Sequence, residues 1–468
     1  MPTPAQYLLN LTLQDRITGS LIGSALGDTI GLYTEFLSAA KAAEVYPSRH
    51  FTLLGPDGRP TPFHLDFHRA PKELGHWTDD TDHALLILLA FLHGADTRTS
   101  ASTSPASSST PCPASPQPTT PSSFPSSRFG GGQPPLPTQL DLAERLRVWT
   151  RQGFPPLQTM PLGLGRLVGR VVSSTSFTTD PEGRAREAWE RTGRNAAPNG
   201  SLMRTHTLGL ISVLRGGGLE GGVGFGGAGG VGGDGNVDVD ENEDEKDDGK
   251  VEEKENTGTR GATGVVEITP AEREVFTCAA RLSRVTHVDP RCVLACVIGM
   301  ALVRGVVRGE VRSETDIDSV ITRCLAWFRA EGKVESDGDV DEAELWRHVK
   351  PEDEDGLEAL RLDEPAAIGY VYKTLGAGVV ALRMAMRKEA VEGRGFLVRT
   401  RVFEELITDL VMRGGDADTN ACFAGALLGG YLGYGTLPDH WKHGLKHEGW
   451  LLSKAEALCQ MCMGDENR

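Results

Sequence analysis

An apolar run that begins directly after a cluster of acids is the feature that most constrains this chain. The stretch GHWTDDTDHALLILLAFL, residues 75–92, places Asp79, Asp80 and Asp82 against a segment whose apolar run predicts a buried helix. A carboxylate moved into a low-dielectric interior is strongly destabilising unless it is paired or binds a metal. These acids must therefore either stay in water or meet a cation.

Helical periodicity dominates the rest of the sequence. Apolar residues recur at three- and four-residue spacings, as in LTLQDRITGSLIGSALGDTIG at 11–31, and Thr and Asp caps precede the apolar run of 75–92. Period-two stretches with turns between them are scarce. We therefore predict an all-α fold, with further helices at 140–150, 201–214, 271–282, 291–307, 315–331, 366–388, 398–412 and 419–433.

Four glycines lie close together in the last of these predicted helices, at Gly425, Gly429, Gly430 and Gly433. Isolated glycines weaken a helix, because they add backbone freedom to the unfolded chain. Four glycines in so short a run instead predict a face on which another helix backbone approaches closely.

Three segments differ from the rest in composition. Residues 97–138 are rich in Ser, Thr and Pro, 216–264 pass from Gly-rich sequence into DVDENEDEKDDGKVEEKE, and 334–358 are acidic. Such compositions cannot bury enough apolar surface to support a core. We predict disordered, solvated inserts that interrupt a single domain spanning 1–468.

Composition excludes several classes of protein. The chain is 39% hydrophobic and 24% charged, as in soluble globular proteins, and its formal net charge of −16 argues against nucleic acid as a partner. We find no signal peptide and no apolar run approaching the roughly 18 residues of a membrane span. Eight cysteines do not make a disulfide framework in so long a chain. We expect a monomer in the cytoplasm or nucleus that contacts no membrane.

A second acidic cluster, GGDADTN at 414–420, also precedes an apolar helix. Carboxylate and hydroxyl oxygens without His or thiolate ligands suit Mg²⁺ or Mn²⁺. The alternative is N-capping, since Asp and Thr are preferred caps that stabilise a helix by ~1 kcal/mol. Taken alone, either cluster fits both readings. The two clusters repeat one chemistry, with Thr78, Asp79 and Asp80 in the first and Asp416, Asp418 and Thr419 in the second.

Six motifs occur along the chain in the order GSALGDTIGLYTEF (23–36), WTDDTD (77–82), PNGSLMR (198–204), VTH (285–287), GYVYKTL (369–375) and GGDADTNACFAGALLGGYLG (414–433). Together they resemble the ADP-ribosylglycohydrolase family. The resemblance implies an all-α bundle with a binuclear Mg²⁺ or Mn²⁺ centre in a cleft. It also implies metal-dependent hydrolysis of the ADP-ribosyl bond on modified protein side chains or small molecules, with release of ADP-ribose.

The resemblance also assigns residues to roles. It makes the two Thr-and-Asp clusters the ligands of two divalent cations, and Asp79 and Asp80 with Glu35 the catalytic acids. Glu35 would be a metal ligand, a general base or both, although a surface position after a helix is the alternative. Gly200 and Ser201 are expected to bind the substrate through backbone N–H groups at a helix start. His287 near the phosphates and Tyr370 near the adenine are further substrate-binding positions, with simple packing as the alternative for both.

Several other polar residues are predicted to have structural roles. Asp28 is expected to be a buried acid that orients a helix or a ligand, and Asp82 to be solvated or a cap. His76 and His83 are expected to pack or lie at the surface, and Arg204 to be structural. The remaining expectations concern cysteines, with Cys292 and Cys296 in the core and the lone pair Cys459 and Cys462 too little for a zinc site.

The bond that is cleaved is the least constrained part of the prediction. Arginine-specific relatives carry an Asp upstream of the motif at 198–204, where this chain has Gly163 in MPLGLGRLVG. This departure puts arginine specificity in doubt. Alternatives for the whole chain are another dinuclear-metal hydrolase, acting on a phosphoester, and a non-catalytic relative that only binds ADP-ribose. A degenerate relative should have lost some acids, and all five are present.

Overall fold

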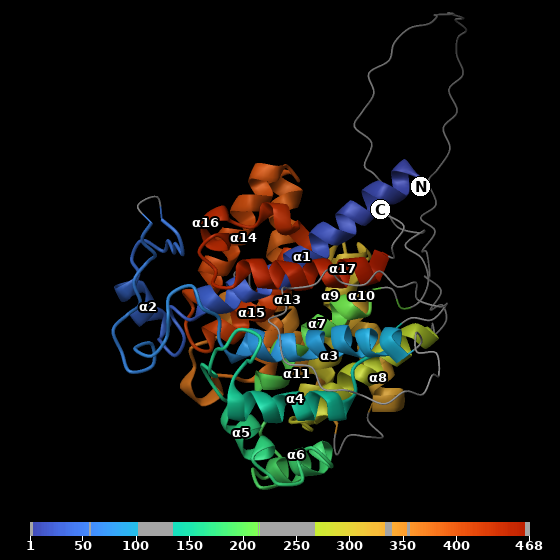
Figure 1. Cartoon of the computed structure of the whole chain (residues 1–468). Coiled ribbons are helices and arrows are strands. Elements are labelled where there is room, and N and C mark those ends of the chain that lie inside the picture. The colour runs from blue at the N-terminus through green and yellow to red at the C-terminus, as the bar shows by residue number, and fades with distance from the viewer. Residues whose placement is uncertain are drawn as a thin grey trace, which may run out of the picture.

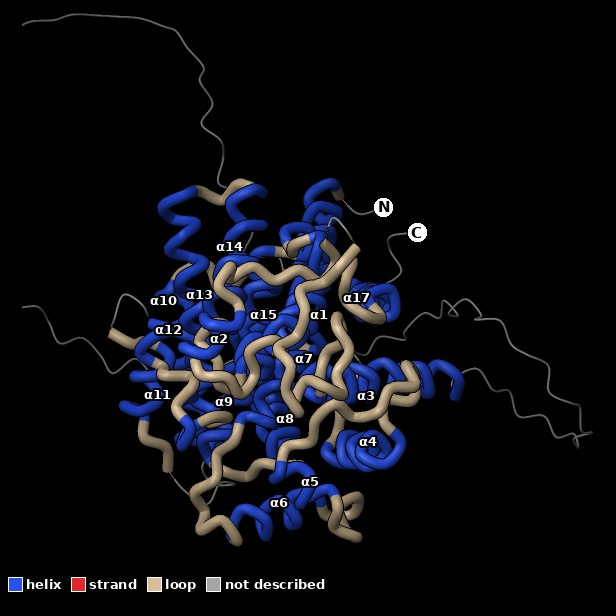
Figure 2. Tube along the Cα trace, turned by 90° about the vertical axis from the view of Figure 1, so that its left-hand side faces the viewer, coloured by secondary structure: helices blue, strands red, loops and turns tan. Residues whose placement is uncertain are grey.

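The computed structural model describes residues 3–55, 58–101, 134–213, 215, 267–332, 339–352 and 356–463. Its regular structure is helical, and among these residues only three isolated β-bridges occur and no strand, as the two views show (Figures 1 and 2). The all-α prediction is confirmed. The longer helices are α1 (Pro4–Gly31), α3 (Asp79–Ala101), α4 (Gln139–Gln152), α8 (Pro270–Arg284), α9 (Pro290–Arg308), α10 (Glu314–Trp327), α13 (Val371–Glu392), α14 (Phe396–Val411), α15 (Ala417–Leu432) and α17 (Glu448–Met463).

Shorter elements connect these helices. Among the described residues they are α2 (Ala39–Val45), α5 (Arg166–Val172), α6 (Pro181–Glu190), α7 (Leu202–Ile211), α11 (Glu342–Val349), α12 (Gly356–Ala359) and α16 (Asp439–Lys442), with single turns η1 (Asn199–Ser201), η2 (Phe328–Gly332), η3 (Pro365–Ala367) and η4 (Tyr434–Thr436). Each helix predicted from periodicity is found. The predicted start at 366 is wrong, because η3 and Gly369, with φ of 76°, precede α13.

The closest helix pair is α1 and α15, which run antiparallel through facing small residues. A Cβ added to Gly19 would lie 2.2 Å from Gly429 O, one at Gly23 would lie 2.5 Å from Gly425 O, and one at Gly27 would lie 1.9 Å from Ala421 O. The predicted close approach is confirmed. It brings the C-terminal end of α1 against the start of α15, where the second acid cluster lies.

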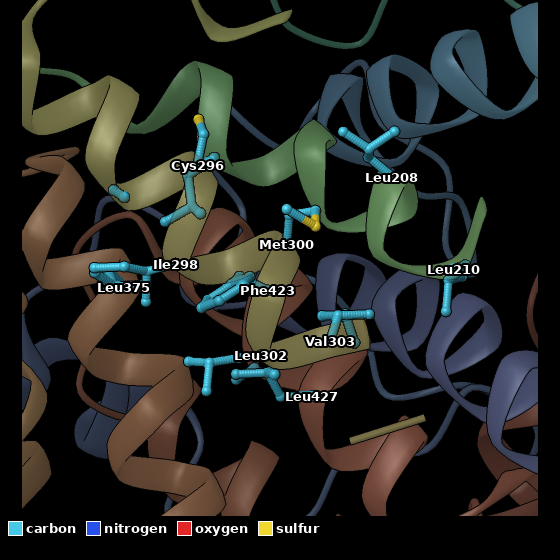
Figure 3. Packing of buried hydrophobic residues seen from close by; sticks show 14 of the residues in the cluster. Leu208, Leu210, Cys296, Ile298, Met300, Leu302, Val303, Leu375, Phe423 and Leu427 are labelled. Carbon is cyan, nitrogen blue, oxygen red and sulfur yellow. The ribbon is translucent and has the colours of Figure 1, made fainter. Parts of the chain in front are cut away.

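The core is centred on α9, which packs against α7, α8, α10, α13 and α15. Figure 3 shows side chains from four of these helices meeting, among them Leu208, Met300, Leu375 and Phe423. Among the described helices, α9 alone is long and apolar enough to cross a membrane. Its apolar 18-residue stretch is 94% buried inside the fold. Its apolar character on all sides is what a central core helix requires.

Local signals explain where many helices begin. Thr138, Thr269 and Ser313 each accept a hydrogen bond from the backbone of the first turn, and an acid three residues later bonds back to the cap. These capping boxes satisfy N–H groups that a helix start would otherwise leave unpaired.

In both views α4, α5 and α6 lie together at the lower end of the molecule (Figures 1 and 2).

The predicted inserts lie largely outside the described residues. The whole of 216–264 falls there, as does most of 97–138. Within 334–358 the expectation of a disordered insert is wrong for 342–349, which form α11. The segment is acidic, but 342–349 form an amphipathic helix that packs against α13 and whose Leu345 and Val349 are buried.

Candidate metal centre

The first acid cluster is held at the start of α3 by a buried acid of α1. Thr78 and Thr81 each donate through both backbone N–H and hydroxyl to the Asp28 carboxylate, at 2.6–3.1 Å. Asp28 is fully buried and thus orients this turn, as predicted. The Thr78 hydroxyl also lies 3.2 Å from Asp80 Oδ2 and 3.5 Å from Asp418 Oδ2.

The second acid cluster begins α15. Asp416 occupies the N-cap position without capping the helix through its side chain. Instead its Oδ2 accepts from Asn199 Nδ2 at 2.8 Å, and its Oδ1 lies 3.4 Å from the Thr419 hydroxyl. Asp418 Oδ1 accepts from the Thr419 backbone N–H at 2.8 Å. The capping alternative therefore does not account for the Asp416 side chain.

The fold brings both clusters together with Glu35. Ligand oxygens of Glu35, Asp416 and Asp418 all lie within 4.8 Å of one another. The Thr78 hydroxyl bridges toward this group through its contact with Asp418. All seven predicted catalytic and metal residues thus converge, and we define them as the acid centre: Glu35, Thr78, Asp79, Asp80, Asp416, Asp418 and Thr419.

Burial and like charge act on these acids together. Burial first, and then the charge of Asp418, raises the pKa of Asp79 to about 7. The pKa of Asp80 and of Asp416 is raised well above its ordinary value by the same two causes in the same order. Burial is also the main cause that raises the pKa of Glu35. So many carboxylates in one buried region are compatible with ionisation only if cations share them.

The donor set fits divalent cations. Asp80 Oδ1 is buried and has no hydrogen-bond partner among the described residues. Every side chain of the acid centre offers only carboxylate or hydroxyl oxygen, the ligands preferred by Mg²⁺ and Mn²⁺. A bound cation would coordinate the unpaired Asp80 Oδ1 and would also offset the mutual repulsion of the buried carboxylates.

Two nitrogen-bearing side chains, one of them the cation of Lys72, contact Glu35, and neither was predicted from the sequence. His68 Nε2 lies 2.5 Å from Glu35 Oε2, and Lys72 Nζ lies 3.3 Å from the same oxygen. Arg69 fixes the backbone, donating through Nε to Leu32 O and Tyr33 O at 3.0 Å. These residues lie in the irregular segment between α2 and α3, which carries no recognisable motif. Only the fold brings them to Glu35.

The sequence model of the ADP-ribosylglycohydrolase family matches residues 9–218 and 238–468, which include every residue of the acid centre. The chain belongs to the ADP-ribosylglycohydrolase family. A solved structure described as an ADP-ribosylglycohydrolase-related protein complex is similar over 96% of this chain and 99% of that chain, at 20% identity and a TM-score of 0.48. No curated protein sequence matches the chain. Family membership supports a hydrolase that acts on ADP-ribosyl linkages.

The substrate positions that the family resemblance suggests lie together beside Asp416. The turn η1 contains Gly200 and Ser201, and its Asn199 N–H donates to Gly369 O, next to Tyr370. A Cβ at Gly200 would lie 3.2 Å from His287 Nε2. The Ser201 hydroxyl is buried and accepts from Ser283 Oγ at 3.2 Å, so only its backbone can face a ligand.

Tyr370 and His287 have protein partners of their own. The Tyr370 hydroxyl donates to Glu344 Oε1 at 2.8 Å, and the Arg291 guanidinium lies 5.7 Å from its ring centroid. His287 is buried with Nδ1 2.7 Å from the Thr286 hydroxyl. Almost none of the His287 side chain is exposed, and the Arg291 guanidinium covers one face of the Tyr370 ring.

Gly163 lies against the acid centre. A Cβ at this position would be 2.1 Å from Asp79 Oδ1, so only glycine leaves room for the carboxylate as placed. The segment around position 163, at which arginine-specific relatives are expected to carry an Asp, therefore borders the site.

The prediction for Asp82 is wrong. Its carboxylate is buried and accepts from the indole N–H groups of Trp77 and Trp149, each at 2.9 Å. A residue two positions from the ligands is turned by the helix into the core, where two indoles replace water. His76 and His83 are buried, in line with packing.

The predicted structural roles of the arginine and the cysteines are confirmed. Arg204 is fully buried and donates to Gly200 O, Leu282 O and the Thr286 hydroxyl. Cys292 and Cys296 lie in the core, and all seven described cysteines are free and buried.

Proposed function

We propose that this chain is a divalent-metal-dependent hydrolase that cleaves the ADP-ribosyl glycosidic bond and releases ADP-ribose. The observation that carries the proposal is the convergence of Glu35 with two Thr-and-Asp clusters at two helix starts. Asp416, Asp418 and Thr419, with Thr78, Asp79 and Asp80, would hold two cations, Mg²⁺ or Mn²⁺. Such cations orient the ribose hydroxyls and a water molecule and offset negative charge.

Glu35 is suited to move the proton. His68 and Lys72 both contact Oε2, which leaves Oε1 for the reacting water. Oε1 would accept a proton as water adds to the anomeric carbon and the bond to the acceptor atom breaks. The same proton then passes to the departing acceptor atom. A pKa raised by burial suits a carboxyl group that must both accept and return a proton.

The ADP-ribose half would be recognised beside Asp416. Backbone N–H groups of Gly200 and Ser201 at the start of η1 and α7 can meet a phosphate without a positive side chain at the surface. His287 and Tyr370 would flank that turn. This arrangement explains how a chain of net charge −16 can bind a diphosphate.

Serine linkage is favoured over arginine linkage. A guanidinium acceptor needs a carboxylate at the rim, and position 163, which borders the site, is a glycine. A serine acceptor makes no such demand, since its oxygen needs only a proton as it leaves.

A panel of substrates tests the proposal. Wild type and Glu35→Gln are incubated with Mg²⁺ and serine-linked, arginine-linked or 1″-O-acetyl ADP-ribose, and free ADP-ribose is followed by mass spectrometry. Wild type should cleave at least one substrate, with Glu35→Gln slower by two or more orders of magnitude. Calorimetric binding of ADP-ribose without any cleavage would replace the proposal with the non-catalytic alternative. Neither binding nor cleavage would direct attention to phosphoesters.

A further inference from the structure

A cavity lies beside the α1 and α15 pair, at the end of the pair that is farther from the acid centre. It encloses about 150 Å³ between the N-terminal half of α1, the end of α9 and the start of α14. From Arg16 to Asp28 the path along α1 is 12 residues, or roughly 18 Å. Its polar lining is mostly positively charged. The lining side chains include those of Arg16, Arg308, Arg312, Arg394 and Arg399, together with the uncharged Tyr431. We name this the arginine cavity.

Arg16 has no counter-ion in this cavity. Its guanidinium makes no hydrogen bond or ion pair with any described residue, and it lies where a Cβ at Gly309 would be 2.6 Å from Nη1. The neighbouring acid, Asp15, makes no ion pair with Arg16 and accepts from the Gly435 backbone N–H, and its charge offsets only part of the effects that lower the pKa of Arg16. Burial first, and then Arg399 and Arg312, lower the pKa of Arg16. A cation surrounded by cations is an unfavourable arrangement unless an anion joins it.

Three of the other arginines have carboxylate partners, and Arg308 Nε lies 2.6 Å from Glu310 Oε1. Buried Glu389 lies 2.6 Å from Arg399 Nε and 3.4 Å from Arg394 Nε, and it also accepts from the Tyr431 hydroxyl. Arg312 reaches only a backbone carbonyl, that of Gly309, with its side chain. Among the described residues, Arg312 therefore also lacks a carboxylate partner.

We propose that the arginine cavity binds a phosphate-bearing anion, with Arg16 and Arg312 as its principal ligands. Planar guanidinium groups present paired N–H donors that match the oxygens of phosphate. The cavity volume of about 150 Å³ is roughly ten times the ~15 Å³ that one water needs, which is room for a phosphate or diphosphate group. Such a site is separate from the ADP-ribose site beside Asp416.

The test is phosphate binding to the full-length protein in EDTA, which removes metal-mediated effects. Inorganic phosphate and diphosphate are titrated by calorimetry, and Tm is measured in phosphate and in sodium chloride of equal ionic strength. Arg16→Gln and Arg312→Gln are compared with Arg194→Gln, an exposed arginine paired with Glu190 one turn away. Loss of one charged hydrogen-bonding partner should weaken binding about tenfold or more.

Folding and function provide independent readouts. Because Arg16 has no described partner, Arg16→Gln should fold with a Tm in chloride at or above that of wild type, and should keep its ADP-ribose release. Its Tm gain in phosphate should fall well below those of wild type and Arg194→Gln. Equal gains in all variants, or no gain over chloride in wild type, would overturn the proposal.

Discussion

Gly163 is the residue at which the structure makes the sharpest prediction. Gly163→Ala would place a methyl group 2.1 Å from Asp79 Oδ1, forcing the carboxylate to move. Since Asp79 is a proposed ligand, we expect at least a tenfold weaker response to Mg²⁺ in an activity assay. Gly165→Ala is the matched control, because its nearest contact would be Val168 at 3.9 Å, and it should behave as wild type. Equal metal responses in the two variants would remove Gly163 from the site.

The buried acids predict how metal stabilisation depends on pH. Burial, then Asp418, raises the pKa of Asp28 and of Asp79 from 3.8 to about 7 in the metal-free protein. The folded state then holds more protons than the unfolded state between about pH 4 and 7, so metal-free stability falls as pH rises through that window. Bound cations favour the ionised carboxylates and reduce this loss.

The measured quantity is the Tm gained on adding Mg²⁺, compared between about pH 5 and 8. Buried His83, His206 and His287, whose pKa is lowered mainly by burial, make stability rise with pH toward about 6.5. Their contribution is common to both curves and cancels in the difference. We expect the gain to grow with pH, and a gain that is independent of pH would contradict the account.

At this scale the sequence predicted residues inside long motifs and missed those outside them. The two Thr-and-Asp clusters of the acid centre were predicted because threonine and acid recur in one pattern before two apolar helices, and Glu35 was predicted only from its place in a motif that resembles the family's. His68 and Lys72 reach Glu35 from an irregular segment, so no spacing rule could place them. The prediction for Asp82 was wrong for a different reason. Its partners are the indoles of Trp77 and Trp149, and only the fold brings these residues together.

At the scale of elements, the spacing of α1 and α15 determines where the acid centre forms. Gly27→Ala would place a Cβ 1.9 Å from Ala421 O, a backbone atom that cannot move without the helix. Overpacking of this kind should lower the free energy of unfolding by ~3 kcal/mol. It should also weaken metal binding, since Asp28 directly follows Gly27 and Asp418 lies one turn from Ala421.

Gly94→Ala supplies the contrast. Gly94 is also helical, in α3, but among the described residues no atom outside the backbone of its own helix lies within 4 Å of an added Cβ. Replacing glycine there should stabilise the protein by about 0.5–1 kcal/mol, because alanine loses less backbone freedom on folding. Denaturant unfolding measures whether the free energy of unfolding falls in Gly27→Ala and rises in Gly94→Ala. Stabilisation or no change in Gly27→Ala would show that the helices are not held at backbone contact.

Long helices were predictable because their apolar periodicity extends over several turns. Short or acidic ones were not, as α11 shows: its two buried residues, Leu345 and Val349, are too few to stand out among acids. Its acids have protein partners, Arg329 for Glu342 and the Tyr370 hydroxyl for Glu344, while α13 supplies the apolar surface that makes the helix stable.

For the whole molecule, the inserts should be dispensable. Residues 104–130 and 220–262 lie outside the described residues, and no motif falls within them. Their joint deletion should leave a cooperatively unfolding protein with unchanged ADP-ribose release. Pro134 is kept because its carbonyl accepts from Arg215. Loss of cooperative unfolding in the deletion variant would show that the inserts belong to the domain.

The arrangement of the helices around one another was available from the sequence only through the family resemblance. Periodicity identified helices, but it could not tell which pair at backbone contact would bring 23–36 and 414–433 together. The match over 9–218 and 238–468 and the facing glycines supply that link.

The central claim is that the acid centre holds the cations on which hydrolysis depends. The most direct measurement is the rate of ADP-ribose release from the best substrate of the panel as Mg²⁺ is titrated into EDTA-stripped wild type and Asp416→Asn. Asp416 contacts Asn199 and Thr419 within the site, so the amide keeps the shape and removes the charge. The account predicts no release before Mg²⁺, recovery in wild type, and a rate at least a hundredfold lower in Asp416→Asn. Full activity of the stripped wild type would contradict it.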